Sequence, residues 1–252
     1  MMWDQLQAVY PGADWALVLV YIRVQACVLA LPGLGERVIS ARVKVALALA
    51  LTPLLAGVAP GPDMPTDSLA MAGQVAVEMV LGFTTGIMLR LLTLAIDIAT
   101  TAIAATASLS QIMGIQNEMS PHPIGNMLHL AGLAILMAMG LPIMLVELMA
   151  DSLRLWPPAA LPQVEGLAMA VVRIVADSFW LAMMLAAPFT LGGFLYQALS
   201  GVINRVMPAL PVIFIGAPAS ILLALMGLAI LAPLLVGIWA NAVLSFMLPA
   251  IP

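Results

Sequence analysis

Long apolar segments alternate with short polar segments along most of the chain. The four clearest apolar segments cover residues 16–34, 45–59, 69–89 and 127–150. A helix needs about 20 apolar residues to cross the hydrocarbon core of a bilayer, so these segments predict membrane helices. From residue 178 onward the single charged residue is Arg205, and this region predicts roughly two to four further helical pieces. The whole pattern therefore predicts about six hydrophobic helices.

Proline and glycine interrupt the apolar segments, above all in the C-terminal part. The interrupting residues there are Pro188, Gly192, Gly193, Pro208, Pro211, Pro218 and Pro233. Proline lacks a backbone donor and frees a carbonyl, and hydrocarbon offers that carbonyl no partner. We therefore expect several helices to be broken into hairpins that pack against protein or line a wet cavity. The alternative is that these are ordinary prolines, which membrane helices tolerate in general.

Composition supports the membrane interpretation and excludes other classes. Charged residues make up 8% of the chain and apolar residues 64%, whereas soluble domains average about 25% charged. No soluble fold of this size can hide so much apolar surface, which excludes a soluble enzyme, a nucleic-acid binder and a disordered chain. We expect an all-α integral membrane protein in which residues 1–252 form one membrane-embedded domain.

Five charged residues lie within or beside apolar segments and have no obvious partner nearby in the sequence. They are Arg23, Glu78, Arg90, Asp97 and Glu147. One interpretation is a proton relay or an ion site, because charges inside a membrane are costly and usually functional. The other, which we favour, is that some of these side chains lie near helix ends and extend toward the polar headgroups.

A cluster of basic residues suggests an orientation. Arg37, Arg42 and Lys44 lie together between the first two apolar segments, and short basic loops usually face the cytoplasm. The acidic N-terminus and the linker at residues 60–67 would then face the opposite side.

The usual signatures of catalysis are missing from the sequence. The two histidines, His122 and His129, are separated by Pro123, and Cys27 is the single cysteine, so a metal site is not expected. There is also no nucleophile elbow, phosphate loop or dinucleotide fingerprint. We therefore expect no catalytic, cofactor-binding or metal-binding residues and no cofactor.

Two stretches resemble a known family. The first is LPGLGERVISARVKVALALALTPLL at residues 31–55, and the second is APFTLGGFLYQALSGVINRVMPALPVIFIGAPASILLALMG at residues 187–227. Together they resemble the FliR family of export-gate proteins, found in flagellar and virulence type III secretion systems. The residues that match the family's pattern are Arg23, Pro32, Arg42, Lys44, Asn204, Arg205, Pro208, Phe214, Gly216 and Pro218.

The resemblance implies a specific function. Proteins of this family are non-enzymatic subunits of the flagellar export gate in the bacterial inner membrane, at the flagellar basal body. They form part of the pore for unfolded flagellar subunits with FliP-like and FliQ-like proteins, and work with FlhB-like and FlhA-like export components. Their contacts are with these proteins, the unfolded cargo and membrane lipid, and not with nucleic acid.

The resemblance also implies a loop that helps to plug the closed pore. By position this loop is the polar stretch at residues 110–126. Its candidate plug residues are Ser110, Met113, Gln116, Asn117, Met119, Pro121 and Asn126.

Two other functions stay open. One is the corresponding subunit of a virulence type III secretion system. The other is a polytopic secondary transporter with discontinuous helices, which would need a paired internal repeat that we do not find in the sequence.

Overall fold

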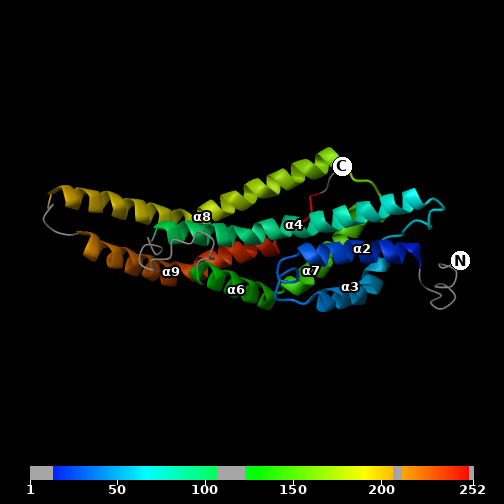
Figure 1. Cartoon of the computed structure of the whole chain (residues 1–252), viewed down its shortest axis with the longest axis horizontal. Helices are drawn as coiled ribbons and strands as arrows, with labels where there is room; N and C mark the ends of the chain where they lie inside the picture. The colour runs from blue at the N-terminus through cyan, green and yellow to red at the C-terminus, as the bar shows by residue number, and fades with distance from the viewer. Residues whose placement is uncertain (1–13, 107–122, 207–211, 250–252) are drawn as a thin grey trace. The chain divides into compact units, whose positions relative to one another are not determined.

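The chain is described here from a computed structural model, which covers residues 14–106, 123–206 and 212–249 (Figure 1). Within these ranges every regular element is a helix and there is no strand. The helices are α2 (Trp15–Ala30), α3 (Ala41–Ala56), α4 (Ser68–Thr106), α6 (Pro123–Ala138), α7 (Leu141–Leu155), α8 (Val164–Val206) and α9 (Val212–Leu244).

Three of these helices are long and apolar enough to cross a membrane. Their candidate spans are Ser68–Ile103 in α4, Val164–Ile203 in α8 and Leu222–Leu244 in α9. The bent pair of α6 and α7 would add a fourth span if the two helices cross together. The prediction of an all-α membrane protein is confirmed.

The helices are broken at fewer positions than the prolines predict. α8 continues through Pro188, and α9 continues through Pro218 and Pro233. One proline removes one backbone hydrogen bond, and the turns on either side of it keep theirs, so a long helix survives the loss. Pro208 and Pro211 lie outside the described residues.

A clear break lies before α7. Gly140 has φ 104°, a left-handed conformation that glycine adopts without strain, and Pro142 follows in the first turn of α7. The missing N–H of Pro142 is not needed in a first turn, so the helix restarts there without loss. The apolar segment at 127–150 is therefore two helices.

Contacts between residues divide the chain into two compact units, which we describe separately. The first comprises Met1–Leu91, Met139–Ile174 and Phe246–Pro252, and the second comprises Leu92–Ala138 and Val175–Ser245. That residues 1–252 act as a single domain stays a prediction.

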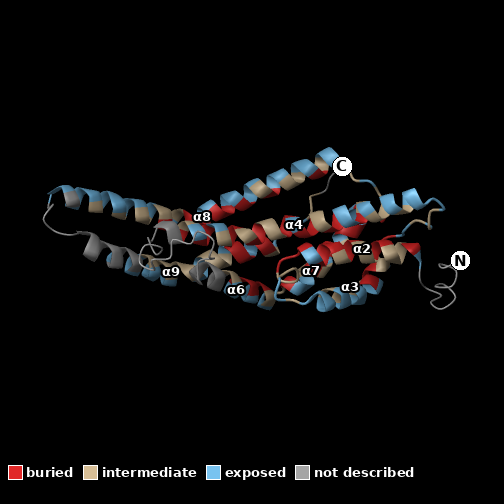
Figure 2. Cartoon of the chain, viewed as in Figure 1, coloured by how far each residue is buried: buried red, intermediate tan, exposed pale blue. Residues whose placement is uncertain are grey.

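The core of the first unit is built around α2. This helix buries nine of its 16 residues, including Leu19, Val24 and Val28, whereas α3, which packs against α2, buries only Ala48, Thr52 and Leu55. Figure 2 shows the difference, with buried residues dominating α2 and exposed residues dominating α3. Arg23 and Cys27 of α2 therefore lie inside the unit.

The helices α2 and α4 run in the same direction within the first unit. Near their starts, the Trp15 Nε1 atom donates to Gln74 Oε1 at 2.7 Å. Further along, Arg23 contacts Glu78, and Ala30 accepts a hydrogen bond from Arg90. Later residues of α2 thus contact later residues of α4, which means that the two helices are parallel. The turn after α2 therefore lies at the same end as Arg90.

Candidate functional site

A buried ion pair joins α2 to α4 in the first unit. The Arg23 Nε atom donates to Glu78 Oε2 at 2.6 Å, and Nη2 donates to Glu78 Oε1 at 3.0 Å. The two side chains are 2% and 0% exposed. The two parallel bonds form the bidentate geometry in which a guanidinium binds a carboxylate most strongly.

The same pair holds the C-terminal end of α7. Arg23 Nη1 donates to the carbonyl oxygens of Ser152, at 3.0 Å, and of Trp156, at 2.6 Å. The Ser152 carbonyl also accepts the backbone N–H of Trp156, and a cation at this end of the helix opposes the negative pole of the helix dipole. Arg23 therefore closes α7 as well as neutralising Glu78.

Glu78 also fixes the segment that follows α7. Its Oε1 atom accepts a hydrogen bond from the backbone N–H of Ala159 at 2.7 Å. Ala159 has φ 66°, a left-handed conformation that costs a residue with a side chain roughly 1 kcal/mol or more. The bond to Glu78 helps to offset this cost, so the ion pair positions α2, α4, α7 and the segment beyond it.

Two glycines on α4 allow the close approach that the ion pair needs. A Cβ atom at Gly82 would clash with the carbonyl oxygen of Arg23 and lie 2.8 Å from Ala26 Cβ. One at Gly86 would lie 2.6 Å from Ala30 Cβ and 2.8 Å from the carbonyl oxygen of Cys27. Small residues four apart are the usual device for close packing of membrane helices. The sequence contains this signal as Gly82-Phe-Thr-Thr-Gly86, and our reading of the sequence missed it.

A second set of polar contacts ties down the turn between α2 and α3. Arg90 Nη2 donates to Glu36 Oε1 at 3.2 Å, and Arg90 Nη1 donates to the Ala30 carbonyl at 3.4 Å. Lys44 Nζ donates to the Gly35 carbonyl at 2.9 Å. The turn is therefore held from α4 on one side and from α3 on the other.

The second unit has its own polar junction, between α4 and α6. The Nδ1 atom of His129 lies 3.0 Å from each carboxylate oxygen of Asp97. Both side chains are part-buried, at 22% and 33% exposed. Thr100 and Thr101 donate their hydroxyls to the Asp97 carbonyl oxygen at 3.0 and 2.8 Å.

Trp239 fastens α9 to this junction. It is the largest fully buried side chain among the described residues, and its ring lies against Gly132 of α6. Its Nε1 atom lies 3.3 Å from the carbonyl oxygens of both Leu92 and Thr93 on α4. The indole ring thus packs against α6 while its N–H group has hydrogen-bond acceptors on α4, as is usual for buried tryptophans.

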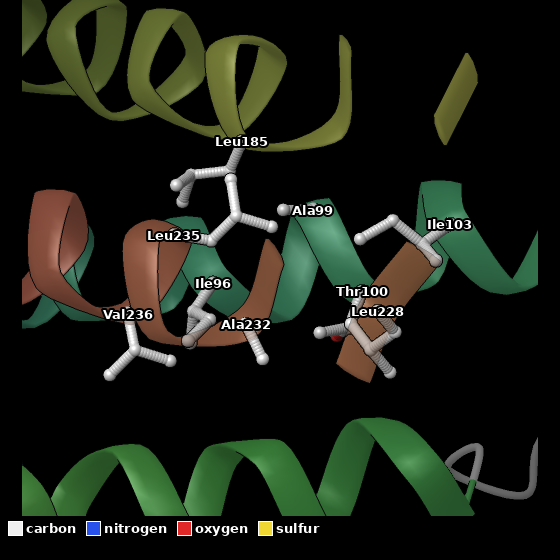
Figure 3. A pocket seen from close by; sticks show the side chains of 9 residues that line it. All are labelled: Ile96, Ala99, Thr100, Ile103, Leu185, Leu228, Ala232, Leu235 and Val236. Atoms are coloured by element: carbon white, nitrogen blue, oxygen red, sulfur yellow. The ribbon is translucent and has the colours of Figure 1, made fainter. Parts of the chain in front are cut away.

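A small apolar cavity of about 20 Å³ lies between α4, α8 and α9 in the second unit (Figure 3). Leu185 of α8 points into it, opposite Ile96 of α4 and Leu235 of α9. The volume suffices for one water molecule, but a water needs two or more polar partners, which this lining does not supply. The cavity is a dry packing defect and too small for a ligand.

The chain matches a family of known proteins over nearly its whole length. The family is described as "Bacterial export proteins, family 1", and the match covers residues 15–246. The chain belongs to this family.

Three relatives are flagellar biosynthetic proteins FliR. The one from Caulobacter vibrioides is 30% identical over 228 residues, which cover 89% of this chain and 90% of the relative. Those from Pectobacterium carotovorum and Escherichia coli are each 25% identical, covering 85% of this chain and 83% of each relative. The resemblance to FliR proteins is confirmed, and the chain is a membrane-embedded component of a flagellar type III export apparatus.

The structure gives four of the five isolated charges a partner. Arg23 pairs with Glu78, Arg90 with Glu36 and Asp97 with His129. The side chains of Arg23 and Glu78 do not extend toward the polar headgroups, because both are buried in the first unit. Glu147 is exposed on α7 and has no ion pair within the described ranges.

The residues that the sequence analysis matched to the pattern of the FliR family have different environments. Arg23 and Pro32 are buried, Lys44 holds the turn, and Arg42 and Arg205 are exposed. Pro208 lies outside the described residues, and the side chains of Asn204, Phe214, Gly216 and Pro218 are not described. The matched residues that the structure does describe therefore include packing and surface positions, and the structure does not bring them together in one site.

Most of the candidate plug residues lie outside the residues that the structure describes. Ser110, Met113, Gln116, Asn117, Met119 and Pro121 lie outside the described residues, and Asn126 belongs to α6 with no description of its side chain. Within the described part of the chain, no three His, Cys, Asp or Glu side chains gather as a metal site would require.

Proposed function

We propose that this chain is a non-enzymatic, pore-forming subunit of the flagellar export gate. In this proposal it assembles with FliP-like and FliQ-like subunits, works with FlhB-like and FlhA-like components, and passes unfolded flagellar subunits outward. It acts in the bacterial inner membrane at the flagellar basal body, without a cofactor and without nucleic acid. The observation that carries the proposal is the family match over residues 15–246, together with relatives whose printed names are flagellar.

The exposed helices of the chain support contact with other subunits. In the most apolar 18-residue stretch of each helix, 56% of the residues of α4 are buried within the chain. The buried share is only 22% in α8 and 6% in α9. The exposed large side chains on α8 include Phe179, Trp180, Met183, Met184 and Phe194. Aromatic residues and methionine are enriched at the cores of protein interfaces, so this face of α8 suits another subunit.

Co-purification tests the assembly. The tagged chain, expressed with its native operon and extracted in mild detergent, should bring FliP-like and FliQ-like proteins with it in one large particle. Recovery of the chain alone, together with normal secretion by a strain that lacks it, would contradict the proposal.

Shortening two exposed aromatic side chains should weaken this assembly. In the variant Phe179→Ala/Trp180→Ala we expect the co-purified subunits to fall by about tenfold or more, because buried aromatic anchors carry much of the energy of an interface. The matched control is Leu69→Ala, another exposed apolar residue, at the start of α4. Equal recovery of the partner subunits with the two variants would show that Phe179 and Trp180 do not contribute to the interface.

The candidate plug gives a separate prediction. Deleting the tip Pro121-His122-Pro123 should make the closed gate leak ions, because the polar segment would no longer fill the pore. The measurement is the ion conductance of cells or vesicles that contain the gate. A deletion of the same length in the 60–67 linker is the control. Unchanged conductance in the tip deletion, with normal assembly, would argue against a plug at this position.

A further inference from the structure

Charge is distributed unevenly along the helices of the first unit. At the turn after α2 the described residues include Glu36, Arg37, Arg42, Lys44 and Arg90, which sum to a positive charge. The opposite end holds Asp14 before α2 and Asp63 and Asp67 before α4, all three exposed. A Cβ atom at Gly61 would meet Ala16, which shows that the acidic linker lies beside the start of α2. The first unit therefore has a basic end and an acidic end.

Most charged side chains at the basic end already form hydrogen bonds or ion pairs within the protein. Arg90 binds Glu36 and the Ala30 carbonyl, and Lys44 binds the Gly35 carbonyl. Arg37 and Arg42 are different, because both are exposed and neither forms an ion pair with any residue in the described ranges. The turn is thus held in place by two cations while two further cations face outward.

Exposed apolar side chains lie next to these two arginines in the sequence. Val38, between them in the sequence, is 90% exposed, and Val43 on α3 is 56% exposed. Further along α3, Leu49 and Leu54 are also exposed. Outward cations beside outward apolar side chains match the boundary of a membrane, where phosphate groups meet acyl chains.

We propose that Arg37 and Arg42 bind the headgroup phosphates of anionic phospholipids at the basic end of the first unit. Guanidinium groups suit this role because they offer two parallel donors to a phosphate. The apolar side chains of the turn and of α3 contact the adjoining acyl chains. The acidic end of the unit, at Asp14, Asp63 and Asp67, faces away from this lipid surface.

Lipid binding by the purified full-length chain in an uncharged detergent tests the proposal. The probe is a fluorescent phosphatidylglycerol, and phosphatidylcholine is the zwitterionic comparison. The variant Arg37→Gln/Arg42→Gln should bind phosphatidylglycerol about ten- to thirtyfold more weakly, since each arginine near an anionic surface contributes about one kcal/mol. The variant Arg37→Lys/Arg42→Lys should keep most of the affinity, because the charges remain.

The matched control removes two other exposed arginines. Arg173 and Arg205 lie on α8, and Arg173→Gln/Arg205→Gln should change phosphatidylglycerol binding by less than about twofold. All variants are compared by gel filtration, and because the four arginines are exposed, their substitution should leave the elution volume unchanged. Equal losses in the two Gln variants would overturn the proposal, since they would indicate a general effect of net charge.

Two competitors identify the source of the anion. Inorganic phosphate should not displace the lipid at concentrations that leave the detergent micelle intact, because a free phosphate gains nothing from the apolar side chains. A poly-glutamate peptide should also fail to displace it. Displacement by phosphate would reassign the arginines to a soluble anion, and displacement by the peptide would reassign them to an acidic protein; either result overturns the lipid proposal.

Discussion

Replacing Arg23 by Met will lower the free energy of unfolding by about 3–5 kcal/mol. The substitution keeps an unbranched side chain of similar length but leaves the Glu78 carboxylate buried without a cation. It also removes the donors from the carbonyl oxygens of Ser152 and Trp156. The measurement is denaturant-induced unfolding in detergent micelles, followed by tryptophan fluorescence.

An exposed arginine gives the matched control for this prediction. Arg154 pairs with Asp151 at 2.8 Å, but the two side chains are 64% and 52% exposed. Arg154→Met should therefore cost less than about 1 kcal/mol, as is typical of surface ion pairs. Equal losses from Arg23→Met and Arg154→Met would mean that the buried pair does not stabilise the first unit.

A double variant separates the buried charge from the lost hydrogen bonds. In Arg23→Met/Glu78→Leu no charge is left without a partner, so part of the lost stability should return. The return should be incomplete, because the Ala159 N–H and the Trp156 carbonyl still lack the partners that Glu78 and Arg23 gave them. A double variant less stable than Arg23→Met would contradict this account, since removing the orphan charge would then bring no gain.

Adding one methyl group at Gly82 will also destabilise the protein strongly. The new Cβ atom would collide with the backbone carbonyl of Arg23 and with Ala26, neither of which can rotate away. The two helices must then separate, which lengthens the bonds between Arg23 and Glu78. We expect Gly82→Ala to cost about 1–3 kcal/mol or more, the usual range for overpacking a core.

The same helix offers a control with the opposite expected sign. At Gly73 no atom lies within 4 Å of an added Cβ, so Gly73→Ala should stabilise α4 by about 0.5–1 kcal/mol through helix propensity. Both variants are measured by the unfolding assay described above. If the two substitutions shift stability in the same direction, close approach at Gly82 is not what holds α2 and α4 together.

The class of the fold followed from composition and from the length of the apolar segments. A chain with 8% charged residues has too little polar surface for any soluble architecture. The extent of single helices was harder to predict. The segment at 69–89 was expected to stop near Arg90, yet α4 continues to Thr106, because Arg90 and Asp97 have partners on other elements and do not have to mark a helix end.

The buried ion pair could be suspected from the sequence but not assigned. Arg23 and Glu78 stood out as charges in apolar segments, but 55 residues separate them. No local spacing rule connects residues that far apart, since helical rules reach only three or four positions. The contacts of Arg23 with the carbonyls of Ser152 and Trp156 could not be predicted for the same reason. Gly82 and Gly86 were within reach, because their spacing is a recognised packing signal.

The pair of Arg23 and Glu78 also constrains the order in which the protein can be made. The ribosome delivers α2 long before Glu78, and it delivers the N–H of Ala159 later still. During that interval α2 carries a guanidinium without its carboxylate, and such a charge costs about 2.5–3.5 kcal/mol where it lies at the centre of a membrane helix. We therefore expect α2 to reach its final position only after α4 has followed it, and a polypeptide truncated before α4 to be less stable than the full chain.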